Sequence, residues 1–168
     1  MNPWKMPVLA LTLALFLSAP YAGAAAEMRG AKMPAADGKD LWSYLQKVNY
    51  RESFTLWPGK GKLYRGKEPH GALLTTYVNE HALDAIRNGK GKMAADSIVV
   101  KENYKPDKTL AAITVMYKVA GFDPAGGGWF WVKYAPDGKV LAEGTPKGCI
   151  SCHGQKKGND WLFTGELR

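Results

Sequence analysis

The stretch that decides the fold is Ala111-Ala112-Ile113-Thr114-Val115-Met116-Tyr117-Lys118-Val119. Ile, Val, Tyr and Val occupy every second position, and Thr, Met and Lys stand between them. Successive side chains of a strand point to opposite faces, so this period of two predicts a β strand with two different faces. An apolar face and a mixed face are typical of an antiparallel sheet.

Further strands are predicted on both sides of this stretch, over residues 54–57, 72–78, 97–103, 129–134 and 139–142, with turns at Pro58-Gly59, 126–128 and 136–138. Residues 58–69 are expected to form a loop. One helix is predicted from an Asp40 cap through Val48, and another from an Asn79 cap to Gly89. The sequence shows no internal repeat. These elements together predict an α+β fold, an antiparallel β-sheet with a few short helices.

The first residues predict export. Lys5 precedes an apolar run over residues 8–17, and Ala22-Gly23-Ala24 fits a signal-peptidase site. We therefore expect residues 1–24 to be a removed signal peptide, residues 25–38 a flexible leader, and residues 39–168 a single domain. No second apolar run follows, so we expect a periplasmic protein with no membrane insertion after processing.

The chain has a formal net charge of +8, which becomes +7 when Lys5 is removed with the signal peptide. A basic surface favours an acidic electron-transfer partner, although the lysines are scattered and most are expected to be solvated. Export and the absence of a recognisable binding motif argue against nucleic acid.

Cys149-Ile150-Ser151-Cys152-His153 spells C-x-x-C-H, the pattern that attaches haem c through two thioether bonds. Cysteines at this spacing reach the two vinyl groups of one porphyrin, and the following histidine ligates the iron. A redox disulfide would need a βαβ context that is not visible here, and zinc would need four ligands. The motif predicts one covalent haem held by Cys149 and Cys152, with His153 as the proximal iron ligand.

Only fifteen residues follow His153, and none is methionine, so a sixth iron ligand would have to come from earlier in the chain. The candidates are Met93, Met116, His70, His81 and the lysines. Each of these residues is more often a packing or surface residue than a ligand. We therefore expect a five-coordinate iron with an open distal face that takes small molecules.

The strand-rich chain before this late haem motif resembles the cytochrome P-460 family, which includes the β-sheet cytochromes c′-beta. The resemblance covers roughly residues 40–168 and is carried by Ser97-Ile98-Val99-Val100-Lys101-Glu102-Asn103-Tyr104, Trp129-Phe130-Trp131-Val132-Lys133-Tyr134, Gly148-Cys149-Ile150-Ser151-Cys152-His153 and Asp160-Trp161-Leu162-Phe163-Thr164. It implies a haem domain that binds or converts NO, CO or hydroxylamine. Family members are often dimers, so the resemblance also implies a homodimer.

The resemblance gives Lys101 a special role, because a lysine at this place in catalytic members bonds covalently to the haem. Lys101 is expected on one strand face with Val99 and Asn103, with Glu102 on the other face. The alternative is an ordinary strand lysine with its ammonium in water.

Two positions depart from the catalytic pattern. Leu74 stands at the position of a distal arginine, and Lys157 stands at the position of a carboxylate after the haem histidine. Glu102 and Glu68 are alternative bases. Phe54, Trp57 and Phe130 are expected in the core, with capping of a ligand pocket as the alternative.

Three functions therefore remain open. The first is binding of NO or a similar ligand, and the second is hydroxylamine oxidation with Lys101 cross-linked to the haem. The third is electron transfer by a six-coordinate cytochrome without ligand chemistry. The fold and the cofactor do not determine which of these three functions the protein has.

Overall fold

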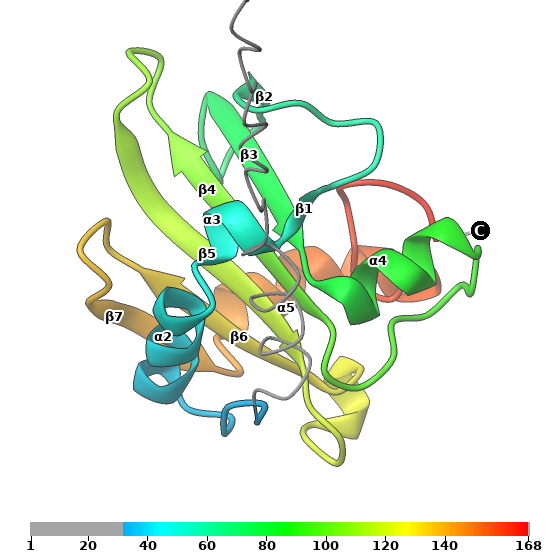
Figure 1. Cartoon of the computed structure of the whole chain (residues 1–168). Coiled ribbons are helices and arrows are strands. Elements are labelled where there is room, and N and C mark those ends of the chain that lie inside the picture. The colour runs from blue at the N-terminus through cyan, green and yellow to red at the C-terminus, as the bar shows by residue number, and fades with distance from the viewer. Residues whose placement is uncertain (1–31, 168) are drawn as a thin grey trace, which may run out of the picture. The chain divides into compact units, whose positions relative to one another are not determined.

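The computed structural model of the chain describes residues 32–167, and every element below lies in the unit formed by residues 33–168. A seven-stranded antiparallel sheet runs through this unit in the order β1-β3-β4-β5-β6-β7, with the short β2 also paired to β3 (Figure 1). The strands are β1 (Thr55–Leu56), β2 (Tyr64–Arg65), β3 (Leu73–Val78), β4 (Ile98–Tyr104), β5 (Leu110–Lys118), β6 (Trp129–Tyr134) and β7 (Val140–Gly144). The predicted α+β fold with an antiparallel sheet is confirmed.

The predicted alternation along β5 separates two hydrophobic clusters. Ile113, Val115 and Tyr117 belong to a cluster on one face of the sheet. Met116 belongs to a second cluster on the other face. The sheet is therefore buried on both sides, and a shift of one residue in strand pairing would exchange the two faces.

In the described residues, four α-helices and two 3₁₀ helices accompany the sheet, namely α2 (Gly38–Lys47), α3 (Tyr50–Ser53), α4 (Glu80–Arg87), α5 (Lys147–His153), η1 (Pro124–Gly126) and η2 (Gly154–Asn159). Leu41 and Leu45 of α2 and Tyr50 of α3 complete the first cluster. α4 and α5 lie on the opposite face, where residues of both helices join the second cluster (Figure 1).

The helix starts illustrate how local chemistry sets the boundaries. Asn79 caps α4 as predicted, because its side chain accepts a hydrogen bond from the backbone N–H of Ala82. The predicted Asp40 cap of α2 is wrong. Asp37 caps this helix, and its carboxylate accepts from the backbone N–H groups of Lys39 and Asp40. Asp40 lies inside the first turn, where a negative charge is favourable.

The predicted strands shift by only one or two residues, while the predicted loop over residues 58–69 contains the short strand β2. Of the expected leader, only residues from 32 onward are described, and Met33 and Ala36 pack against the first cluster. The predicted signal peptide lies outside the described residues. Within residues 32–167, no helix has the length and apolar character needed to cross a membrane.

Candidate functional site

The C-x-x-C-H run lies on α5, which begins after Pro146 and ends at His153. Cys149 and Cys152 are one helical turn apart and therefore share a face of this helix. Both are free thiols, and both are partly buried. The predicted motif is thus presented on a short, regular element rather than on a loose terminal segment.

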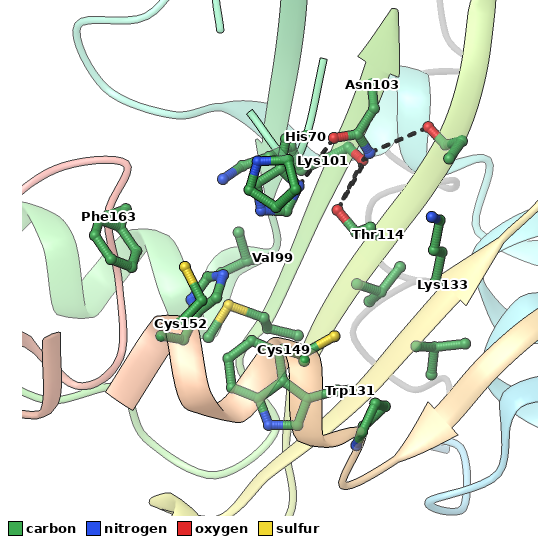
Figure 2. A pocket seen from close by; sticks show the side chains of 18 of the residues that line it. His70, Val99, Lys101, Asn103, Thr114, Trp131, Lys133, Cys149, Cys152 and Phe163 are labelled. Atoms are coloured by element: carbon green, nitrogen blue, oxygen red, sulfur yellow. Dashed lines mark hydrogen bonds between the residues drawn. The ribbon is translucent and has the colours of Figure 1, made fainter. Parts of the chain in front are cut away.

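α5 and the segment that follows it form one wall of a cavity of about 590 Å³, and the sheet forms the other wall. The two cysteines and His153 line it together with residues of four neighbouring strands, β4 to β7. Figure 2 shows both cysteines at this cavity. Most of the lining is apolar, including Val99, Met116, Trp131, Leu141, Leu162 and Phe163. A volume of this size is typical of sites for small molecules and cofactors.

The side chain of His153 is buried and held in one orientation. Its Nδ1 lies 2.6 Å from the carbonyl oxygen of Trp161. A carbonyl oxygen only accepts hydrogen bonds, so Nδ1 carries the proton and Nε2 keeps its lone pair. Burial lowers the pKa of His153, and the hydrogen bond to Trp161 opposes this shift. The imidazole is therefore a neutral group with one nitrogen ready for a metal.

Aromatic rings pack around this imidazole. The ring centre of Trp131 lies 4.7 Å from that of His153, and the ring centre of Phe163 lies 5.2 Å from it, both in edge-on arrangements. These contacts restrict rotation of the His153 ring and exclude water from it.

A buried ion pair fixes the segment that carries the Trp161 carbonyl. Lys118 Nζ lies 2.6 Å from one carboxylate oxygen of Asp160 and 2.8 Å from the other. The same carboxylate accepts from the backbone N–H of Met93, while the Asp160 carbonyl accepts from the indole N–H of Trp129. Asp160 and Trp161 both have positive φ angles, of 50° and 64°. This network holds a tight turn beside His153, and our sequence reasoning did not predict it.

Lys101 lies on the cavity wall with Val99 and Asn103, as the strand pattern predicted. Burial lowers the pKa of Lys101 to about 8. Among residues 32–167, no carboxylate forms an ion pair with its ammonium group. The structure thus brings Lys101, both cysteines and His153 to one cavity.

The structure adds His70, which precedes β3 and lines the same cavity. The centres of the His70 and His153 rings are 5.9 Å apart. Burial lowers the pKa of His70 to about 4, with further contributions from the charges of Lys101 and His153. His70 was only one of several sixth-ligand candidates in the sequence, because no local pattern distinguishes it.

The two candidate bases lie at different places. Glu102 is buried on the opposite face of β4, where it accepts hydrogen bonds from Tyr50, Arg51 and Tyr104. It is therefore not the alternative base that the sequence had left open. Glu68 stays a candidate, because it lines a smaller cavity that shares Lys101 and His153 with the first.

The three aromatic residues considered as pocket caps are core residues instead. Phe130 belongs to the first cluster, Phe54 packs against that cluster, and Trp57 belongs to the second cluster. Met93 is buried in the second cluster, and His81 is exposed on α4. Leu74, at the position of the distal arginine, is buried, and Lys157, at the position of the carboxylate after the haem histidine, is exposed.

The donor set fits a covalently attached haem. Two free thiols on one helix face, a neutral imidazole with a free Nε2 and a largely apolar cavity are the features that such a group requires. Within residues 32–167, no group of three or more His, Cys, Asp or Glu residues has the arrangement of a bare metal site.

The chain also matches a known family. The family model described as Cytochrome P460 matches residues 49–164, a span that holds all seven strands and the C-x-x-C-H motif. No curated protein matches the chain.

Proposed function

Because the chain belongs to the cytochrome P460 family of haem cytochromes, we propose that its cavity holds one haem c and binds small nitrogen ligands. Thioether bonds to Cys149 and Cys152 attach this haem, and His153 is the proximal iron ligand. The observation that carries the proposal is that both thiols and the free Nε2 of His153 belong to one apolar cavity. The signal-peptide pattern at the N-terminus favours a periplasmic location.

The residues of the chain hold and insulate this group. The haem supplies an iron that takes NO or CO, or exchanges electrons with a nitrogen compound. The carbonyl of Trp161 holds His153 in the tautomer that offers Nε2 to a metal and increases its basicity. Val99, Met116 and Leu162 line the cavity with apolar side chains.

Binding of a neutral ligand fits the cavity better than oxidation does. Of residues 32–167, no Asp or Glu lines the larger cavity, and Glu68 lines only the adjoining smaller one, so a base that removes protons from hydroxylamine would have to act from there. An apolar wall favours diatomics such as NO and CO over hydroxylamine, because it offers few partners for the hydrogen-bonding groups of that polar molecule. We therefore place ligand binding first and hydroxylamine oxidation second.

Oxidation remains the second function because of Lys101. With a pKa of about 8, roughly a tenth of the Lys101 side chains are neutral at pH 7. At the ordinary pKa of lysine the neutral fraction is roughly three in ten thousand. A neutral amine is a nucleophile, and Lys101 lies on the wall of the cavity that would hold the haem. A bond from Nζ to a meso carbon would replace an N–H and a C–H bond and release two protons and two electrons, so a peroxide-class oxidant would have to take up the electrons. The electron-transfer partner of the protein would be an acidic protein, because the chain is basic overall.

Carbon monoxide tests the ligand-binding function directly. We expect one CO to bind per haem when the reduced protein is titrated, with a shift of the Soret absorption band. If CO fails to bind to the reduced protein at saturating concentration, both ligand-binding functions are wrong and the electron-transfer alternative is favoured.

Peptide mass spectrometry tests the role of Lys101. After digestion, a Lys101 peptide joined to the haem peptide of α5 would support the oxidation function, and Lys101→Met should then leave haem on the α5 peptide alone. Lys133→Met is the matched control, because Lys133 lines the same cavity from β6. A free Lys101 peptide from the wild-type protein would exclude the cross-link and the oxidation that depends on it.

A further inference from the structure

Two imidazole rings face the same cavity from different parts of the chain. His153 ends α5, and His70 ends the segment that leads into β3. Their ring centres are 5.9 Å apart and their planes are nearly perpendicular, at 88° (Figure 2 shows His70 beside Lys101 at the cavity). The third histidine of the chain, His81, is exposed on α4 and takes no part.

The proton on His70 can be placed from its neighbours. Its Nδ1 lies 3.0 Å from Oδ1 of Asn103. The side-chain NH₂ of Asn103 donates to the backbone carbonyls of Lys101 and Ala112, at 2.9 and 3.2 Å. Because carbonyls only accept, these two contacts fix which end of the Asn103 amide is the oxygen.

The Asn103 oxygen therefore accepts from His70, so Nδ1 of His70 carries the proton and Nε2 keeps its lone pair. Asn103 is itself buried on β4, and its NH₂ also lies 3.2 Å from the hydroxyl of Thr114. His70 and His153 thus share one arrangement, in which Nδ1 donates to a fixed oxygen and Nε2 is left free. This arrangement is typical of histidines that ligate metals.

The distance between the two ring centres distinguishes direct ligation of the iron by His70 from a hydrogen bond of His70 to a molecule bound on the iron. Metal–imidazole bonds of about 2 Å on both sides of an iron, plus the distance from nitrogen to ring centre, place the two ring centres roughly 6 Å apart. If a diatomic molecule on the iron accepted a hydrogen bond from His70, the distance between the two ring centres would be longer by about 3 Å or more. The observed 5.9 Å matches direct ligation.

We propose that His70 is the second axial ligand of the haem iron in the resting protein, opposite His153, and that small ligands displace it. This inference rests on the haem attachment proposed above. It changes the expected resting state from five-coordinate to six-coordinate while keeping the site exchangeable.

The surroundings of His70 allow such an exchange. A second cavity of about 390 Å³ adjoins the first, and His70 lines both of them. The chain before His70 belongs to the segment around β2, and the side chain itself is only partly buried. A displaced imidazole therefore has space to move into without disturbing the core of the sheet.

The test compares ferric wild-type protein with His70→Ala by electron paramagnetic resonance and absorption spectroscopy. We expect a low-spin signal from the wild type and a high-spin signal from His70→Ala. We also expect CO to bind to the reduced variant about tenfold faster or more, because no internal ligand has to leave first. His81→Ala is the matched control and should keep the wild-type spectrum and rate.

Two further variants keep the inference testable if His70→Ala folds poorly. His70→Met should stay low-spin with a higher reduction potential, because a methionine ligand raises the potential of a His-ligated haem. Imidazole added to His70→Ala should restore the low-spin signal.

The outcomes separate this inference from the proposed function. A high-spin wild-type protein that binds CO would overturn the role of His70 while leaving the ligand-binding function intact. A His70→Ala variant that remains low-spin would also overturn it. Failure of CO to bind to the wild-type protein would overturn the ligand-binding function, and binding of CO to His70→Ala alone would show that small ligands do not displace His70.

Discussion

Replacing Cys149 and Cys152 together with alanine should yield a protein that releases its haem on denaturation, whereas the wild type keeps it. The reason is that thioether bonds survive unfolding, while the bond from His153 to iron and the contacts of the cavity wall do not. We expect essentially complete loss, measured as haem that extracts into acidified butanone or leaves the protein band on a denaturing gel. Each single variant should keep one bond and show weakened attachment.

The experiment needs two controls. Ser151→Ala lies between the two cysteines, is exposed, and should retain haem as the wild type does. A cross-link from Lys101 would also retain haem, so the double cysteine variant should be repeated with Lys101→Met. Haem that stays attached to this triple variant would show that the thioether assignment is wrong.

Local patterns were sufficient to predict the sheet and the attachment motif. The alternation along β5 gave the strand and both of its faces, because residues two apart on a strand share a face in any fold. The same rule placed Lys101 with Val99 and Asn103, where the structure has them. Asn79 was recognised as a cap because its hydrogen bond joins residues only three positions apart.

The contacts that complete the site are long-range, and no local pattern encodes them. Asn103 and His70 are 33 residues apart, and Lys118 and Asp160 are 42 residues apart. Lys118 looked like one more polar residue on the mixed face of β5. Its burial follows from the C-terminal turn that folds back over that face, which depends on the positive φ angle of Asp160. Only the three-dimensional arrangement of strands and turn identifies these residues as parts of the site.

Removing the positive charge of Lys118 should lower the free energy of unfolding more than any substitution on the surface. Lys118 and Asp160 have side chains that are only 7% and 2% exposed. Lys118→Met keeps the length of the side chain and leaves the Asp160 carboxylate buried without a counter-charge. We expect the free energy of unfolding to fall by about 3–5 kcal/mol, measured by urea denaturation of the haem-loaded protein. The haem spectrum should shift as well, because the turn holds the Trp161 carbonyl against His153.

The double variant Lys118→Met/Asp160→Asn separates the effect of the charge from the loss of packing. Asparagine keeps an acceptor for the backbone N–H of Met93 and tolerates a positive φ angle, so the turn should persist. With neither charge buried, most of the lost stability should return, because replacing both members of a buried pair is far less costly than removing one. Lys90→Met, which breaks an exposed ion pair with Asp84, is the matched control and should leave the free energy of unfolding essentially unchanged, because water screens that pair. Equal stability of Lys118→Met and the wild type would mean that water or another cation reaches Asp160, and that the turn beside His153 does not depend on this pair.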